Sequence, residues 1–273
     1  MSSCLLCCGV CWVVAAVHDV CGAQLTFSNT NFISLNETLP TPPTPATPYP
    51  STNIVTGLSG LVVQKATVTL QGFSHTFPSD VDILLVGPQG QRTILMASAG
   101  GQNRYSVTNL TLTFDDDATN FLPVNSALTN GVFKPTNGFL AQVGYTNLHF
   151  DFPPPAPPGN SNAPAALSVF RNTDPGGTWS LFAVADGTTD SGSIANGWSL
   201  NLTVAVPVQI THSGTNVVVS WPGSVTNCTL QSATSLSTHA WSNVLTTPAL
   251  GAGQFNVTNP VFPGSSFYRL IKN

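Results

Sequence analysis

The side chains with the clearest potential for chemistry are aspartates, which gather in three short stretches of the chain. They are Asp80 with Asp82, Asp186 with Asp190, and the run Asp115, Asp116 and Asp117. Carboxylates from neighbouring loops are common ligands of Ca²⁺, which takes six to eight oxygens. We therefore expect a calcium site at the first two groups. The third is a separate acidic turn, whose adjacent carboxylates repel unless solvated or bridged by a cation.

The alternative for all these aspartates is a structural one. Asp is favoured in turns because its side chain hydrogen-bonds its own backbone, so each group also fits a set of solvated turn residues. No EF-hand loop is present, because no Asp-x-Asp-x-Asp-Gly run leads to a terminal Glu.

Histidine does not add a transition-metal site to this picture. The five histidines are His18, His75, His149, His212 and His239. None is paired at the i, i+2 or i, i+4 spacing that such sites favour. We expect His75 to be a structural residue at a strand end rather than a catalytic one.

The elements that must position the aspartates are predicted to be strands. Apolar and polar residues alternate in the segments 65–71, 109–114 and 198–204. This period is typical of strands with one buried face. The apolar residues 83–86, the Gly/Pro turn at 87–90 and the apolar residues up to Met96 predict a hairpin. No window combines helical apolar spacing with capping signals. We therefore expect an all-β fold of stacked sheets.

Two segments resemble the signature halves of the P domain, the β-sandwich beside the catalytic domain of furin- and kexin-like proprotein convertases, which also occurs in bacterial secreted proteins. The first is SHTFPSDVDILLVGPQGQRTILM at 74–96, and the second contains Gly177-Thr178-Trp179-Ser180-Leu181, Asp186, Asp190, Gly192 and Gly197-Trp198-Ser199-Leu200. The resemblance covers residues 25–204 and implies a jelly-roll β-sandwich that brings the two aspartate loops near each other. It matches Asp80 to the family's aspartate before the buried strand and Asp82 to one found in bacterial members.

This resemblance raises the question of peptide hydrolysis. A subtilisin-type centre needs Asp-[Ser/Thr]-Gly, His-Gly and Gly-Thr-Ser segments, with the serine activated by a positioned histidine. Asp190-Ser191-Gly192 matches the first by letters alone, His212-Ser213-Gly214 is not His-Gly, and no Gly-Thr-Ser or Gly-x-Ser-x-Gly segment occurs. We therefore expect no catalytic residues in this chain.

The N-terminus carries an apolar segment and most of the cysteines. Residues 4–17 are apolar and too short to span a bilayer, and Cys21-Gly22-Ala23 suits cleavage before Gln24. We expect a secretory signal peptide over 1–23, although no Lys or Arg precedes its apolar run. Its removal would leave Cys228 alone, so we expect a mature fold without a disulfide and Cys228 as a small buried hydrophobe.

The remaining segments complete the domain organisation. The prolines of 39–50 predict a stiff, extended surface loop. Short strands with Trp221 as their core aromatic predict a small sandwich at 206–273, which loosely resembles the fibronectin-III-like or immunoglobulin-like tails of bacterial exported proteins. The P-domain-like sandwich is expected at 24–205.

Composition limits the partners. Only 7% of residues are charged, and the chain has 23 Gly and 22 Pro, which is typical of a turn-rich secreted β protein. The seven Lys and Arg residues are scattered and the net charge is −4, so we expect no nucleic-acid binding. We expect a secreted or cell-surface protein, with no transmembrane span in the mature chain.

Three functions remain open. The first is a calcium-assisted, non-catalytic module for binding, adhesion or stabilisation. The second is an accessory domain of a secreted subtilisin-like protease whose catalytic part is on another chain, because the P domain of convertases packs on and stabilises the protease. The third is carbohydrate binding, in which Trp241 and the loop around Tyr145 would stack on sugar.

Overall fold

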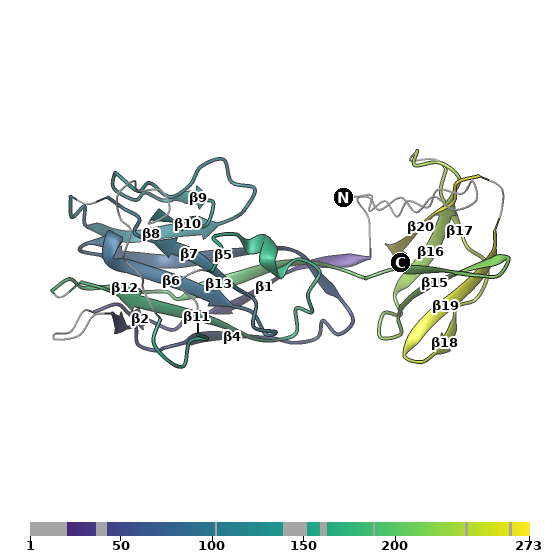
Figure 1. Cartoon of the computed structure of the whole chain (residues 1–273), viewed down its shortest axis with the longest axis horizontal. Helices are drawn as coiled ribbons and strands as arrows, with labels where there is room; N and C mark the ends of the chain where they lie inside the picture. Colours follow the sequence, from purple (N-terminus) through teal and green to yellow (C-terminus); the bar gives the residue numbers. More distant parts are fainter. Residues whose placement is uncertain are drawn as a thin grey trace. The chain divides into compact units, whose positions relative to one another are not determined.

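The structure, a computed structural model, describes residues 21–36, 43–101, 103–138, 152–158, 163–187, 189–237, 240–261 and 264–273. The fold is all-β, as the sequence predicts, and its sheets form sandwich-like arrangements (Figure 1). The chain divides into two compact units. The larger consists of Gln24–Leu58 and Val63–Thr203, and the smaller contains Val204–Asn273, Ser59–Val62 and the N-terminal residues to Ala23.

The larger unit contains a seven-stranded sheet in the order β1-β13-β5-β12-β2, in which β8 also pairs with β5 and with β9. Its strands are β1 (Gly22–Asn29), β2 (Ile33–Ser34), β5 (Val62–His75), β8 (Val107–Phe114), β9 (Gly131–Phe133), β12 (Gly192–Ile194) and β13 (Trp198–Ala205). The predicted alternation is confirmed in β5, where Ala66, Val68 and Leu70 are buried while the intervening side chains are not. It follows that β5 has one face in the core.

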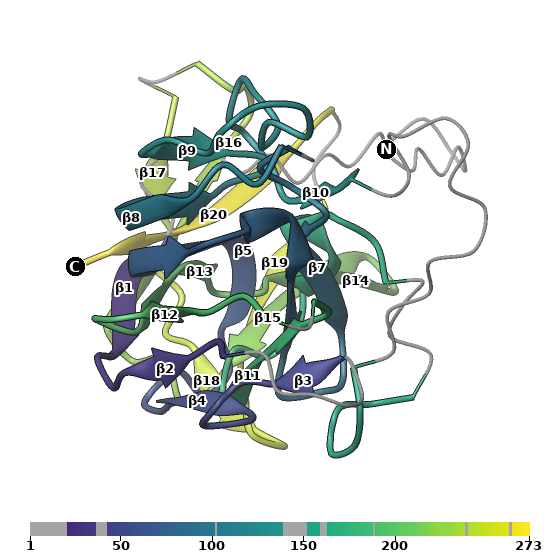
Figure 2. The same cartoon turned by 90° about the vertical axis from the view of Figure 1, so that its left-hand side faces the viewer.

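The second sheet of the larger unit has six strands in the order β10-β7-β6-β11-β3, with β4 also pairing with β11. Figure 2 labels β3, β4, β7, β10 and β11 of this sheet. Its strands are β3 (Thr44–Pro45), β4 (Ser51–Val55), β6 (Val81–Val86), β7 (Arg92–Ala97), β10 (Thr136–Asn137) and β11 (Gly177–Ala185). All residues of β6 are buried, and β6 and β7 form the expected antiparallel hairpin. Two short 3₁₀ helices of the described chain precede strands of this sheet. η1 (Pro78–Asp80) leads directly into β6, and η3 (Leu167–Phe170) lies between β10 and β11. Trp179 and Trp198, which belong to the second signature segment, are core residues.

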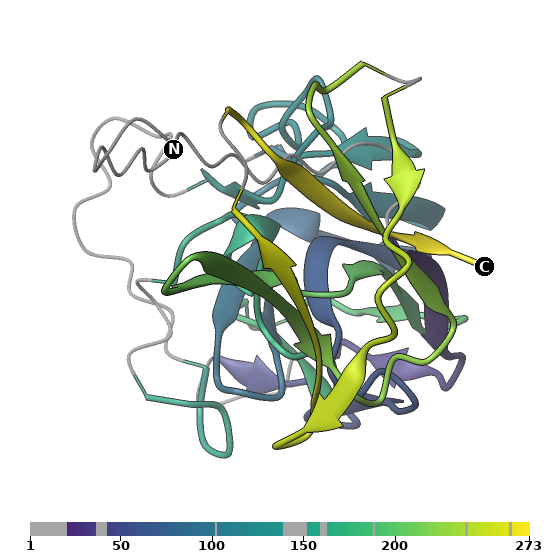
Figure 3. The ribbon, with the colours of Figure 1, turned by 90° about the vertical axis from the view of Figure 1, so that its right-hand side faces the viewer.

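The smaller unit consists of a four-stranded sheet, β14-β15-β19-β18, and a three-stranded sheet, β17-β16-β20. The strands, drawn green to yellow in Figure 3, are β14 (Gln209–Ser213), β15 (Asn216–Pro222), β16 (Cys228–Ala233), β17 (Ser242–Asn243), β18 (Ala249–Gly251), β19 (Gln254–Pro260) and β20 (Phe267–Lys272). Trp221 is 2% exposed and packs with Val219, Val257 and Leu270, which confirms it as a core aromatic.

Part of the proline-rich segment is ordered by the sheet rather than forming a free surface loop. Residues 37–42 lie outside the described part, but Thr44 and Pro45 form β3, opposite Ala185 and Val184 of β11. The next residue, Ala46, is buried and donates its backbone N–H to the carbonyl of Ala183. Proline fits here because an edge strand does not need every N–H for pairing.

The cysteine prediction is wrong. Cys21 and Cys228 form a disulfide with a Cα–Cα distance of 6.0 Å. Cys21 is also buried in the core of the smaller unit, where its backbone N–H donates to the carbonyl of Leu270 and its carbonyl accepts from Val206. Cys21 is therefore part of the folded structure, whereas cleavage before Gln24 would remove it. The cysteines at 4, 7, 8 and 11 lie outside the described residues.

We expect Cys228→Ala to lower the free energy of unfolding of the smaller unit by about 2–5 kcal/mol, the usual cost of removing a native disulfide. The disulfide joins residues separated by 207 positions, so it strongly restricts the unfolded chain. Guanidinium unfolding followed by tryptophan fluorescence measures the effect. Reductant should lower the midpoint of the parent chain and leave that of Cys228→Ala unchanged, and equal midpoints for the oxidised parent and the variant would contradict the prediction.

Candidate functional site

The pairing of β6 with β11 brings three of the predicted aspartates to one end of the six-stranded sheet. Asp80 ends η1, Asp82 is the second residue of β6, and Asp186 directly follows β11. In this antiparallel register Asp82 lies opposite Val184, and the backbone N–H of Asp186 donates to the carbonyl of Asp80 at 2.9 Å. Residues more than a hundred positions apart in sequence therefore become neighbours because two buried strands pair.

Asp82 is the central residue of this group and is only 1% exposed. The backbone N–H of Ser98 donates to Oδ1 at 3.3 Å, while Oδ2 has no hydrogen-bond partner among the described residues. Burial raises the pKa of Asp82 well above its ordinary value, and the charges of Asp186 and Asp80 raise it further, against the Ser98 hydrogen bond. The Asp82 side chain must therefore either be protonated or, when ionised, have its charge compensated by a cation.

Asp190 is held by other partners. Thr76 Oγ1 donates to Asp190 Oδ1 at 2.8 Å, and Arg104 forms an ion pair with Oδ2. The guanidinium of Arg104 also lies over the ring of Phe77, 4.8 Å from its centroid. The structure therefore gives Asp190 a counter-charge from the protein itself, which the sequence analysis missed because Arg104 is 86 residues away in the chain.

The run Asp115, Asp116 and Asp117 is also compensated within the larger unit. Lys65 Nζ lies 2.9 Å from Asp115 Oδ1 and 2.6 Å from Asp117 Oδ2, and the hydrogen bond from Lys65 lowers the pKa of Asp117. Asp116 accepts the backbone N–H groups of Leu167 and Ser168 at 2.8 and 2.7 Å, at the start of η3. These contacts make the run a structural link between β5, the turn after β8, and η3.

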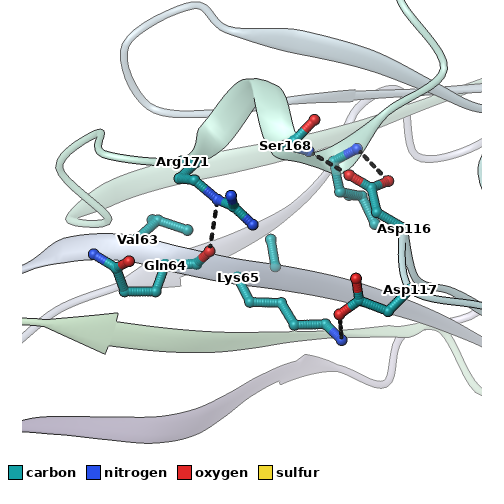
Figure 4. A pocket seen from close by; sticks show the side chains of 9 residues that line it. Val63, Gln64, Lys65, Asp116, Asp117, Ser168 and Arg171 are labelled. Atoms are coloured by element: carbon teal, nitrogen blue, oxygen red, sulfur yellow. Dashed lines mark hydrogen bonds and ion pairs between the residues drawn. The ribbon is translucent and has the colours of Figure 1, made fainter. Parts of the chain in front are cut away.

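The pocket beside this run is small (Figure 4). It has a volume of about 20 Å³, with Gln64, Lys65, Asp116 and Arg171 among its lining residues, and Arg171 donates through Nε to the Gln64 carbonyl at 3.2 Å. This is room for about one water molecule. Because its charged groups are used in the contacts above, the pocket is a poor candidate for a ligand site.

Within the described ranges, no three His, Cys, Asp or Glu side chains are grouped so that they could hold a metal ion. Asp80, Asp82 and Asp186 share one neighbourhood, but a cation bound there would also need oxygens from backbone carbonyls or water, which Ca²⁺ accepts readily.

His75 has a structural role, as its sequence context suggested. It is buried, its Nδ1 accepts the backbone N–H of Phe77 at 3.1 Å, and its Nε2 lies 3.3 Å from the carbonyl of Leu35. Both ring nitrogens are therefore engaged by the backbone. His18, His149 and His239, like Tyr145, lie outside the described residues.

Similarity to known proteins is weak and partial. No family model and no curated protein matches the chain. A chain in the crystal structure of the Aeromonas sobria serine protease and its chaperone ORF2 is similar, with a TM-score of 0.28 and 14% identity over 67% of this chain. The match spans only 27% of that chain. A likeness at this level carries no argument about function. Among the described residues, no helix is long and apolar enough to cross a membrane.

We expect the thermal midpoint of the cation-free protein to fall as pH rises above the unfolded-state pKa of Asp82, 3.8. The folded state binds the Asp82 proton more tightly than the unfolded state, so this stability is complete below the unfolded pKa and is lost as pH rises through the folded pKa. Melting in EDTA from about pH 4 to about pH 8 measures the effect.

The matched variants are Asp82→Asn and Asp117→Asn. Asp82→Asn stays neutral at every pH and should lose this dependence. Asp117→Asn should retain it, because the pKa of Asp117 is shifted downward and its contribution is lost as pH falls instead. The same pH profile for the parent and Asp82→Asn would show that Asp82 does not titrate as described.

Proposed function

We propose that this chain is an exported, non-catalytic β-sandwich protein that acts as a binding, adhesion or stabilising module, with a calcium ion bound beside Asp82. The observation that carries the proposal is the buried Asp82 carboxylate, whose Oδ2 lacks a hydrogen-bond partner among the described residues and which lies beside Asp80 and Asp186. The Cys21–Cys228 disulfide supports export, because disulfides persist in oxidising compartments outside the cytoplasm.

Calcium is the cation that this environment favours. The available ligands are hard oxygens from carboxylates and the nearby backbone, and no histidine or cysteine belongs to the group, which disfavours zinc and copper. Asp82 would be the central ligand, with Asp80 and Asp186 nearby and with backbone carbonyl and water oxygens completing the shell. The ion would compensate the buried charge and connect the start of β6 to the end of β11. Asp190 and the run 115–117 are left out of the proposed site because other groups already hold them. Arg104 pairs with Asp190, and Lys65 pairs with Asp115 and Asp117. Backbone N–H groups hold Asp116.

A role beside a protease is the second candidate, and it rests on the resemblance of 74–96 and 177–200 to the P-domain signatures. In this second role, the chain would pack on and stabilise a secreted subtilisin-like catalytic domain that belongs to another chain. Co-purification from the culture medium of the source cells distinguishes the two roles. A stoichiometric subtilisin-like protease in the purified complex would favour the second, and isolation of the chain alone would favour the first.

Calcium binding predicts a ligand-dependent rise in stability. We expect saturating CaCl₂ at neutral pH to raise the free energy of unfolding by about 2–3 kcal/mol at a hundredfold excess over the dissociation constant. Thermal melting during a calcium titration of EDTA-treated protein measures this shift. Mg²⁺ should give a smaller shift, because it loses its water ligands reluctantly.

Asp82→Asn should abolish the calcium-dependent shift while leaving the chain folded, because the amide keeps the shape of the side chain without its charge. Asp117→Asn, which removes an exposed carboxylate paired with Lys65, is the matched control and should respond to calcium like the parent. A parent midpoint that does not change over the titration would refute the calcium site.

A further inference from the structure

The outer face of the three-stranded sheet carries a row of polar side chains, one from each strand. Gln231 of β16 lies opposite Asn243 of β17 on one side and Arg269 of β20 on the other. Arg269 Nε donates to Gln231 Oε1 at 2.9 Å, and Gln231 Nε2 donates to Asn243 Oδ1 at 2.9 Å. Residues in register on neighbouring strands face the same side of a sheet, so this row forms as a direct result of strand pairing.

Each amide oxygen of this row already accepts one hydrogen bond from within the row, while several N–H donors are left. Gln231 Oε1 and Asn243 Oδ1 each accept a hydrogen bond from inside the row. The Nη1 and Nη2 groups of Arg269 and the Nδ2 group of Asn243 have no partner among the described residues. A surface that offers N–H donors at both ends of a fixed row is suited to an anion or another strong acceptor.

Trp241 fixes the orientation of the guanidinium. The Arg269 guanidinium carbon lies 4.4 Å from the centre of the Trp241 ring, and Nε is anchored by Gln231. A guanidinium stacked on an aromatic ring and held at Nε keeps its outer edge, with Nη1 and Nη2, for two parallel hydrogen bonds to one carboxylate. The side chain is therefore ordered before any ligand binds, which lowers the entropic cost of binding.

No acidic side chain in the described part of its own unit can pair with Arg269. The chain contains no Asp or Glu from 191 to 273, and none in 21–23 or 59–62, so the described part of the smaller unit has no acidic side chain. By contrast, Lys65 and Arg104 of the larger unit pair with Asp115, Asp117 and Asp190. No acidic side chain of the described part of this unit therefore competes with a ligand for the positive charge of Arg269.

We propose that this face of β17-β16-β20 binds an acidic polysaccharide, with Arg269 holding a uronate carboxylate and Asn243 a neighbouring sugar oxygen. The inference rests on the proposed binding role of the chain, but on a different unit from the calcium site. A polysaccharide fits better than an acidic peptide because the row crosses the face of the sheet, whereas an extended peptide gains affinity by pairing along a sheet edge. Side-chain amides, a guanidinium and an indole also suit a ligand rich in hydroxyl and carboxylate oxygens.

The experiment is isothermal titration calorimetry of the full-length chain with polygalacturonate oligosaccharides. The buffer contains EDTA, so that calcium binding does not contribute to the measured heat. We expect binding of the acid form and at least about tenfold weaker binding of the methyl ester, which has the same backbone without the charge. Equal binding of the acid and its ester would overturn the proposal.

Three variants test the assignment to Arg269. Arg269→Gln should weaken binding about tenfold or more, and Arg269→Lys should weaken it less, because the ammonium keeps the charge but not the two-point contact. Lys272→Gln, which removes a nearby charge in the same strand, should change the affinity less than about twofold, as expected for an exposed charge outside the row. Parental affinity in Arg269→Gln would overturn the proposal.

Two further readouts keep the outcomes separate. Near-UV circular dichroism and thermal melting show whether each variant folds. If Arg269→Gln does not fold, the affinity of Arg269→Lys supplies the test. Polyglutamate is titrated in parallel. Equally strong, Arg269-dependent binding of polyglutamate would assign the face to acidic proteins and overturn the polysaccharide. A missing calcium response with intact uronate binding would refute only the calcium site, and the reverse result only this inference.

Discussion

The pairing of β6 with β7 and β11 is the constraint on which the larger unit and its candidate site depend. All six residues of β6 are buried, so its backbone groups must find partners in the neighbouring strands. Once that register is set, Asp82 is inside, and Asp186 must lie beside Asp80 because it follows β11 directly. A carboxylate in an otherwise apolar strand opposes the stability of the sheet at neutral pH unless something compensates its charge. The architecture that buries Asp82 therefore also creates the demand for a cation or a proton.

Much of the fold could be predicted because it depends on local patterns. Alternation in β5 and β13 and the Gly/Pro turn between β6 and β7 are visible in the sequence, and packing only had to preserve them. β3 was missed because proline density was interpreted as a loop, whereas pairing with β11 needs only a few edge hydrogen bonds. The disulfide was missed because a small-residue cleavage pattern assigned Cys21 to the signal segment. That assignment left Cys228 without a partner, although Cys21 and Cys228 together make the even number of cysteines that a disulfide requires.

The candidate site was predicted less well, because the residues next to an aspartate in the sequence do not show whether a lysine or arginine pairs with it in the fold. Asp82, Asp190 and Asp117 look alike in the sequence, yet they differ in whether a distant cation reaches them. Lys65 is 52 residues from Asp117, and Arg104 is 86 residues from Asp190. Only tertiary pairing shows which carboxylates are neutralised. Asp80 and Asp186 lie beside Asp82 because of the backbone register, and no lysine or arginine is among the causes that shift the pKa of Asp82.

The distribution of charge gives the two units different chemistry. Every described acidic residue lies before position 191, in the larger unit, whereas the described part of the smaller unit has Arg269 and Lys272 and no acidic side chain. Arg269 is held by a neutral amide and an aromatic ring instead of a carboxylate, and both contacts orient the guanidinium without cancelling its charge. An ion pair would have stabilised the same side chain and made it inert toward anions. Because strand register places Gln231 between Arg269 and Asn243, the row keeps both its order and its charge, which is the combination that recognition of an external carboxylate requires.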